Sequence, residues 1–139
     1  MGVRLVTVLF LALSFISCAT NRTKNGKRIG LWIEKDTVAG QIQITRGRYK
    51  DGLEKNTWKT YLDGKLVKRE VYRDSICHVF HFYPDGSVSR EGYTRIANEG
   101  VFTHWFYFGD WYSYDTDGKL VSVDTYYQGE LVGEKDAAP

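Results

Sequence analysis

Short runs of alternating apolar and polar residues, each closed by a turn signal, follow one another along most of the chain. Three of them are near echoes: "YLDGKLVKREVY" at 61–72, "YPDGSVSREGY" at 83–93 and "YDTDGKLVSVDTY" at 114–126. Each has a tyrosine, then Asp-Gly, then a strand-like run that ends in an acidic residue and another tyrosine. Asp-Gly between such runs is a strong β-hairpin signal, because both residues tolerate the positive φ of a type I′ turn. The pattern predicts repeated hairpins.

Superposing the echoes gives a period. The first copy is followed 22 residues later by the second, and the third copy has one extra residue before its Asp-Gly. The matched positions are Trp58, Tyr61, Asp63, Gly64 and Leu66; Phe80, Tyr83, Asp85, Gly86 and Val88; and Trp111, Tyr114, Asp117, Gly118 and Leu120. A degenerate copy begins at 30–36, where Trp32 matches Trp58 and "TVAGQIQI" replaces the Asp-Gly turn. Such periods indicate one supersecondary unit stacked repeatedly, so we expect a single all-β domain of stacked antiparallel β-hairpin repeats over 29–134.

Composition agrees with this fold class and excludes one function class. Aromatic residues make up 15% of the chain and proline occurs only twice, as suits half-buried strands. The net charge is only +2, and the Lys and Arg residues are spread along the chain. A nucleic-acid binder that neutralises phosphates needs a basic face or stripe, so we expect no nucleic-acid partner.

The N-terminus reads as a targeting signal. Arg4 precedes a predominantly apolar run without charged residues, Leu5–Ile16, which as a helix of about 1.5 Å per residue is too short to span a bilayer core of about 30 Å. We therefore expect residues 1–17 to be a cleaved signal peptide. The polar segment 18–28 is expected to be a flexible tether, and 135–139 a disordered tail. Ordinary secretion with cleavage nearby is the alternative.

Ser17 followed by Cys18 resembles the lipobox of bacterial lipoproteins, although Phe15 stands where leucine is usual. The resemblance implies lipidation of Cys18, cleavage before it, and membrane attachment through the lipid. Ala19 after the cysteine is compatible, by the same resemblance, with the periplasmic face of an outer membrane in a Gram-negative host. Cys77 would then be the free thiol; a Cys18–Cys77 disulfide is the competing interpretation.

The repeat itself resembles bacterial MORN-type repeats, in particular the antitoxin-like variant with units of the form G-x-W-x-x-Y-x-x-[ND]-G-x-L and then E-x-x-Y-x-x-G. Beyond the positions already matched, Glu70 and Tyr72, Glu91 and Tyr93, and Tyr126 and Gly129 carry it. The likeness covers about 29–133, with "TRIANEGVFTHWFYFG" at 94–109 as an insertion or decayed unit. It implies an elongated sheet of hairpins with aromatic residues in its interior. It does not imply catalysis.

The sequence gives only weak signals for a metal site or for catalysis. "SYDTDGKLVSVD" at 113–124 nearly matches an EF-hand calcium loop, with Asp115 and Asp117 at ligand positions. However, Ser113 stands at the first ligand position and the flanking segments are poor helix formers. His78 and His81 are three apart, so on a strand they face opposite sides. We expect no metal site, no cofactor and no catalytic residue.

The aromatic segment "HWFYFGDWYSY" at 104–114 breaks the period. It is either a core strand or an exposed surface that stacks on sugars or holds a protein. The candidate binding residues there are His104, Trp105, Tyr107, Trp111 and Tyr112. The sequence as a whole predicts a non-catalytic envelope lipoprotein that serves as a protein-interaction or scaffolding module; the alternative is a carbohydrate or cell-wall binder that uses these aromatic residues.

Overall fold

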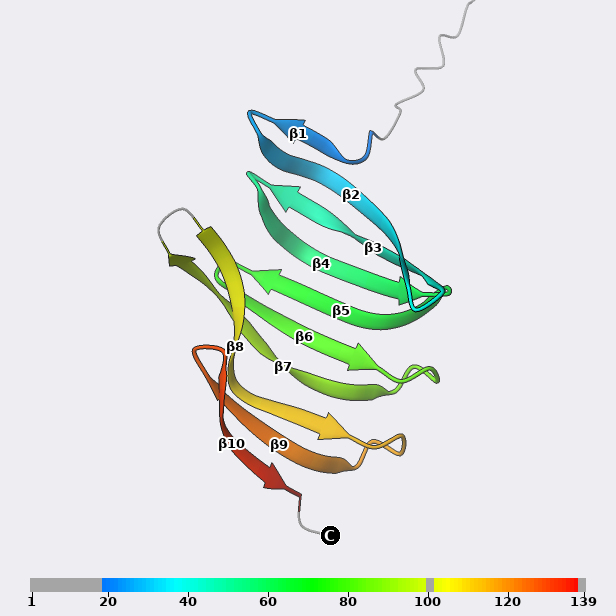
Figure 1. Ribbon diagram of the computed structural model, residues 1–139, viewed down its shortest axis with the longest axis vertical. Coiled ribbons are helices and arrows are strands. Elements are labelled where there is room, and N and C mark those ends of the chain that lie inside the picture. Colours follow the sequence, from blue (N-terminus) through cyan, green and yellow to red (C-terminus); the bar gives the residue numbers. More distant parts are fainter. Residues whose placement is uncertain (1–18, 100–101, 138–139) are drawn as a thin grey trace, which may run out of the picture.

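The computed structural model describes residues 19–99 and 102–137, which form one open antiparallel β-sheet (Figure 1). The ten strands lie side by side in chain order, each joined to the next by a hairpin. They are β1 (Arg22–Lys24), β2 (Lys27–Val38), β3 (Gln41–Lys50), β4 (Leu53–Leu62), β5 (Lys65–Arg73), β6 (Ile76–Phe82), β7 (Val88–Glu99), β8 (Phe102–Tyr114), β9 (Leu120–Tyr127) and β10 (Glu130–Asp136). The predicted all-β class and the sequential hairpins are confirmed.

The three Asp-Gly hairpins have two different kinds of turn. Asp63 and Gly64 both have positive φ (46° and 79°) and form a two-residue loop between β4 and β5, as the type I′ prediction requires. The prediction is wrong for the turns at 85–86 and 117–118, where only the glycine has positive φ. There a longer loop contains a β-turn. In the first loop Gly86 N–H donates to Tyr83 O, and in the second Gly118 N–H donates to Asp115 O.

A register shift within the β4–β5 ladder explains an error in the predicted period. Thr60 pairs with Lys68 but Tyr61 pairs with Leu66, so β5 has one extra residue at this point. Because side chains alternate along a strand, the extra residue reverses the face that equal spacing to Asp-Gly predicts for the residues of β6. Val79, and not Phe80, lies in the row of Trp58, since both Trp58 and Val79 pair with Glu70.

The ends of the sheet also differ from expectation. The segment 18–28, expected to be a tether, contains β1 and the start of β2, joined through Asn25 and Gly26, which have positive φ. Asn-Gly is itself a type I′ signal, so this hairpin was readable in the sequence. Likewise β10 extends to Asp136, into the segment 135–139 expected to be disordered. Residues 1–17 and Cys18 lie outside the described residues.

A small core forms where the long β7–β8 hairpin bends back over the sheet. Figure 1 shows the first half of β8 curling past β5 and β6, and Trp105 of β8 meets Tyr72 of β5 in an edge-to-face contact with ring centroids 5.0 Å apart. Beneath lie Cys77 and Trp111, both fully buried, and Val79. A single open sheet has no second layer to bury its apolar face, so this curl supplies one locally.

Candidate binding surface

The register divides the side chains of the sheet between two faces, because residues directly opposite in an antiparallel ladder point the same way. We call one the tryptophan face. It is defined by the row that crosses the strands through Trp32, Gly47, Trp58, Glu70, Val79, Gly92, Trp111 and Asp124. We call the other the basic face. It is defined by the row Ile33, Arg46, Lys59, Arg69, Phe80, Glu91, Tyr112, Val123 and Lys135.

Three tryptophans of the tryptophan face repeat one local geometry. Each follows, two positions later, a residue in the left-handed conformation: Gly30 before Trp32, Asn56 before Trp58 and Gly109 before Trp111. Each indole N–H donates to a backbone carbonyl of the preceding strand, at 3.2, 3.2 and 3.1 Å to Arg22 O, Arg48 O and Tyr93 O. The spacing of glycine or asparagine, any residue and tryptophan is the sequence signal for this unit. The repeat pattern G-x-W already contains this position, but it does not by itself indicate the left-handed conformation or that Asn56 takes the place of glycine.

The predicted aromatic binding residues do not form one surface. Trp111 is fully buried, and its ring stacks on Tyr107 with centroids 4.2 Å apart. Trp105 and Tyr107 are partly buried against the core, and the Trp105 N–H points at Glu54 Oε2, 3.4 Å away. Only His104 and Tyr112 are exposed, and by register both lie on the basic face. Three of the five predicted binding residues in 104–114, namely Trp105, Tyr107 and Trp111, thus pack in the core or against it.

The histidines lie apart from one another, as the alternation predicts. His78 is on the basic face, 3.0 Å from Glu91 Oε2. His81 is on the tryptophan face between Lys68 and Arg90, and burial together with these two cations lowers its pKa below the usual 6.5. Among the described residues, no group of three or more His, Cys, Asp or Glu side chains is arranged to hold a metal ion.

Two further groups have structural partners. Cys77 is a free, fully buried thiol. Burial, and to a smaller extent the negative charge of the nearby Glu70, raises its pKa to about 12. It is therefore a poor nucleophile. Asp115, in the calcium-like stretch, accepts the backbone N–H groups of Asp117 and Lys119 on one carboxylate oxygen, at 3.0 and 2.8 Å. Its role in the described fold is to hold the turn.

Charge separates strongly between the faces of β2 to β10, which sequence reasoning missed. The described cations of the basic face are Lys27, Lys35, Arg46, Arg48, Lys50, Lys55, Lys59, Arg69, Arg73, Arg95 and Lys135, and its described carboxylates are Glu91, Asp110 and Glu130. On the tryptophan face the described carboxylates are Glu34, Asp36, Glu54, Glu70, Asp124, Glu134 and Asp136, and the cations are Arg28, Lys65, Lys68 and Arg90. A near-neutral chain thus presents one strongly basic face.

The ion pairs follow the same division. Arg28–Glu34, Lys68–Glu70 and Arg90–Asp124 are all on the tryptophan face, at 3.2, 3.1 and 2.8 Å. On the basic face, the described residues show only the pair of His78 with Glu91. Three of its arginines lie over aromatic rings instead: Arg46 over Tyr61, Arg69 over Phe80 at 4.3 Å, and Arg95 over Phe108. The cations of this face therefore keep their charge available to a ligand.

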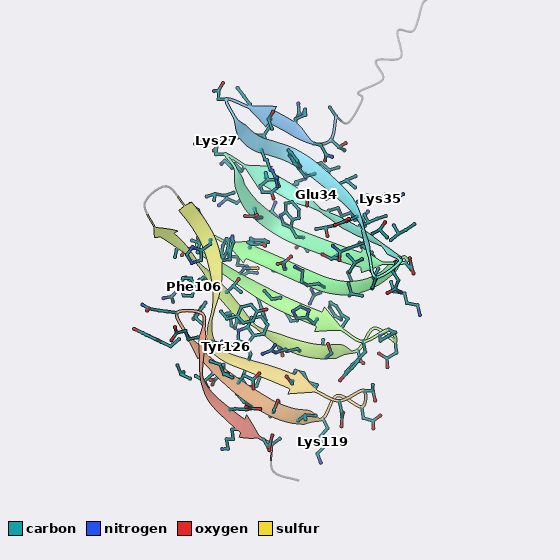
Figure 2. The ribbon with its side chains drawn as sticks, in the orientation of Figure 1. Lys27, Glu34, Lys35, Phe106, Lys119 and Tyr126 are labelled. Carbon is teal, nitrogen blue, oxygen red and sulfur yellow. The ribbon has the colours of Figure 1, made fainter. Side chains whose placement is uncertain are left out.

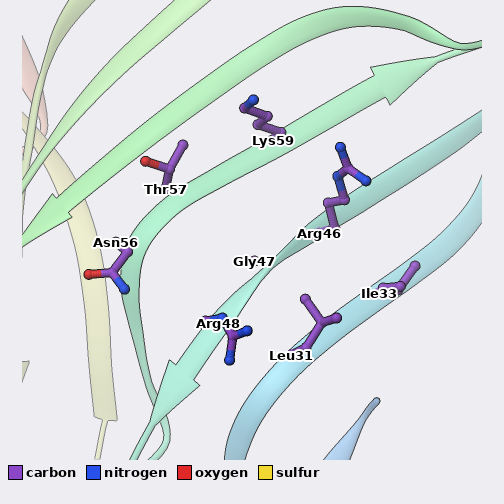
Figure 3. A pocket seen from close by; sticks show the side chains of 8 residues that line it. All are labelled: Leu31, Ile33, Arg46, Gly47, Arg48, Asn56, Thr57 and Lys59. Carbon is purple, nitrogen blue, oxygen red and sulfur yellow. The ribbon is translucent and has the colours of Figure 1, made fainter. Parts of the chain in front are cut away.

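Two hollows indent the basic face. The first, of about 420 Å³, lies over β2 to β4 and is lined by Leu31, Ile33, Arg46, Gly47, Arg48, Asn56, Thr57 and Lys59 (Figure 3). The second, of about 400 Å³, lies over β5 to β7 and is lined by Arg69, Val71, Arg73, Ile76, His78, Phe80 and Tyr93. Lys59 of the first is directly opposite Arg69 of the second, so the hollows are neighbours across the β4–β5 ladder.

Side chains emerge along the whole sheet in Figure 2, and the described strands carry no covering layer of helices. Within the described residues, no helix is long and apolar enough to cross a membrane. The chain matched no family model, no curated protein and no solved structure.

Proposed function

We propose that this chain is a non-catalytic binding module held at the cell envelope by a lipid on Cys18. The observation that carries the binding role is the separation of charge on an exposed sheet. Arg46, Lys59 and Arg69 lie directly opposite one another on three successive strands, and like charges in that register destabilise a sheet. Such a costly arrangement is accounted for if a partner of opposite charge covers it.

The hairpins, on this proposal, are copies of one unit that resembles the MORN-type repeat. Support comes from the geometry shared by Trp32, Trp58 and Trp111, each two residues after a left-handed residue and each bonded to the preceding strand. A repeat of this kind extends a surface without enclosing a cavity. A scaffolding or interaction role uses such a surface directly.

The envelope location rests on the resemblance of Ser17-Cys18 to a lipobox. Replacing Cys18 with alanine is expected to move the protein from the membrane fraction to the soluble fraction and to abolish incorporation of labelled fatty acid in a bacterial host. Cys77→Ala is the matched control, because it removes the other cysteine and leaves the lipobox intact. A Cys18→Ala variant that stays membrane-bound and labelled would exclude this anchor.

The binding role is tested by cross-linking the full chain in envelope extracts and identifying what co-purifies. A variant with Arg46→Gln and Arg69→Gln should lose the captured partner if the basic face binds it. A partner retained by this variant and lost on changes to the tryptophan face would place the interaction on the opposite side of the sheet.

A further inference from the structure

The basic face carries a path of complementary groups that runs across the strands. It begins in the first hollow with Arg46, continues through Lys59 and Arg69, and reaches the ring of Phe80. We call Arg46, Lys59 and Arg69 the cation ladder. Because neighbouring strands are about 4.8 Å apart, the ladder presents positive charges at short, regular intervals.

Beyond the ladder the chemistry changes from charge to rings and hydrogen bonds. His78 stacks on Tyr93 at 4.3 Å and lies 3.9 Å from Phe80, which makes an aromatic floor. Tyr93 is 41% exposed, so one ring edge or face of this floor is open to a ligand. Next to it, a smaller hollow of about 200 Å³ is lined by Glu91 and Tyr114 among others, and the Tyr114 hydroxyl donates to Glu91 at 2.9 Å.

We propose that this path binds an acidic oligosaccharide, with its carboxylate groups on the cation ladder and its sugar rings on the aromatic floor. The inference rests on the proposed binding role of the sheet and names the ligand class. Guanidinium groups pair with carboxylates in two-pronged hydrogen bonds, and Arg46 and Arg69 supply them on either side of Lys59. The Glu91 carboxylate accepts hydrogen bonds from sugar hydroxyls.

Two observations favour an acidic glycan over other polyanions. A nucleic-acid backbone carries a phosphate on every unit, and Glu91 at the far end of the path repels it, whereas a neutral sugar meets Glu91 with hydroxyl donors. A bilayer favours tryptophan at its interface, yet Trp32, Trp58, Trp105 and Trp111 all lie on the tryptophan face or in the core. The cations also line hollows, which admit a narrow chain more readily than a flat bilayer.

The test compares binding of the full chain, in mild detergent, to oligogalacturonate and to its methyl ester, which keeps the sugar backbone and removes the charge. We expect the acidic form to bind at low salt, to bind more weakly as salt rises, and to bind far more tightly than the ester. The variant Arg46→Gln with Arg69→Gln is expected to lose at least about tenfold in affinity. Lys24→Gln with Lys119→Gln removes the same charge away from the path and should bind as the unmodified chain does.

Anionic vesicles of phosphatidylglycerol and a single-stranded oligonucleotide complete the comparison. If either binds more tightly than oligogalacturonate and loses binding in the Arg46→Gln, Arg69→Gln variant, the ligand class proposed is wrong. If no polyanion binds, the ladder is not a polyanion site. A protein partner captured from envelope extracts in that case would preserve the proposed binding role while overturning the glycan. Thermal unfolding of each variant at the same temperature as the unmodified chain, or at a higher one where like charges are removed, shows that the fold is intact.

Discussion

The indole of Trp58 lies directly on the backbone of Gly47, and that of Trp111 lies in the same way on Gly92. A Cβ atom added at Gly47 would be 2.0 Å from Trp58 Cδ2, and one added at Gly92 would be 2.2 Å from Trp111 Cδ2. In both places the register shifts at the glycine, between Arg46 and Arg48 on β3 and between Glu91 and Tyr93 on β7. The neighbouring strand, which carries the tryptophan, has extra residues opposite the glycine. The bulge brings the ring across to the neighbouring strand, where only glycine leaves room for it.

Gly47→Ala and Gly92→Ala are therefore expected to destabilise the sheet strongly. The rings are tied down by their N–H bonds to Arg48 O and Tyr93 O, so the added methyl forces a shift of backbone or of the buried indole. Overpacking of this kind costs about 1–3 kcal/mol or more. Denaturant unfolding followed by tryptophan fluorescence measures the free energy of unfolding.

Gly133→Ala is the matched control, because a Cβ there meets Thr125 at an ordinary 3.6 Å. We expect its cost to be well below that of the other two, at about 1 kcal/mol or less. If Gly47→Ala unfolds at the same denaturant concentration as Gly133→Ala, the close approach of Trp58 does not constrain the fold.

Much of the fold was readable in the sequence because its signals are local. Asp63-Gly64 specifies its own turn through φ, and alternation in the flanking runs specifies strands. The face of each residue was less readable, since it depends on the register between strands. Phe80 was matched to Trp58, but the extra residue of β5 between Leu66 and Lys68 puts Val79 in that row instead. The basic face escaped detection for the same reason. Arg46, Lys59 and Arg69 are far apart in sequence, and only the register brings them together.

The state of the 104–114 segment was also beyond local reasoning. Trp111 and Tyr112 are adjacent, yet the first is fully buried and the second is 37% exposed. Burial there follows from the curl of the β7–β8 hairpin over Tyr72 and Cys77, a contact between distant segments. An aromatic-rich composition does not tell which of two neighbouring rings faces the core.

Cys77 should react with thiol reagents only when the protein unfolds. Its sulfur is fully buried, and the pKa of about 12 keeps it protonated at neutral pH. In a Cys18→Ala background we expect maleimide labelling of the native protein to be slower than labelling in denaturant by about two orders of magnitude or more. Mass spectrometry over time gives both rates.

The control moves the thiol by one residue, with Ile76→Cys and Cys77→Ala together. Position 76 is on the basic face and Ile76 is 37% exposed, so this thiol should label rapidly in the folded protein. Equal native labelling at positions 76 and 77 would mean that the cluster of Cys77, Val79 and Trp111 opens readily.

His81 is expected to make the protein less stable in mild acid. Its folded-state pKa is lowered by burial, then by Lys68 and Arg90, with Glu70 opposing. At pH values between this lowered pKa and the usual 6.5, His81 is protonated in the unfolded chain and neutral in the folded chain. The free energy of unfolding therefore falls as pH drops through about 6.5, and this loss ends below the folded pKa.

His81→Gln removes that proton-binding site, so the fall in stability between about pH 7.5 and about pH 5 should be smaller than in the unmodified protein. His104→Gln is the control, because it makes the same replacement at an exposed histidine. A profile that flattens equally in both variants would contradict the assignment to His81.

Asp115 provides the last test, since it decides whether the third Asp-Gly is only a turn. Its oxygen already accepts two backbone N–H groups, from Asp117 and Lys119, so Asp115→Ala should cost about 0.5–2 kcal/mol, like the loss of a capping residue. Asp115→Asn keeps an acceptor oxygen and should cost less, whereas Asp117→Ala removes a calcium-like carboxylate without removing those two bonds. Calcium should leave the melting temperature unchanged in all three variants and in the unmodified protein. A rise with calcium that disappears in Asp115→Asn and Asp117→Ala would instead establish a cation site, because a ligand stabilises the fold only if it binds the folded state.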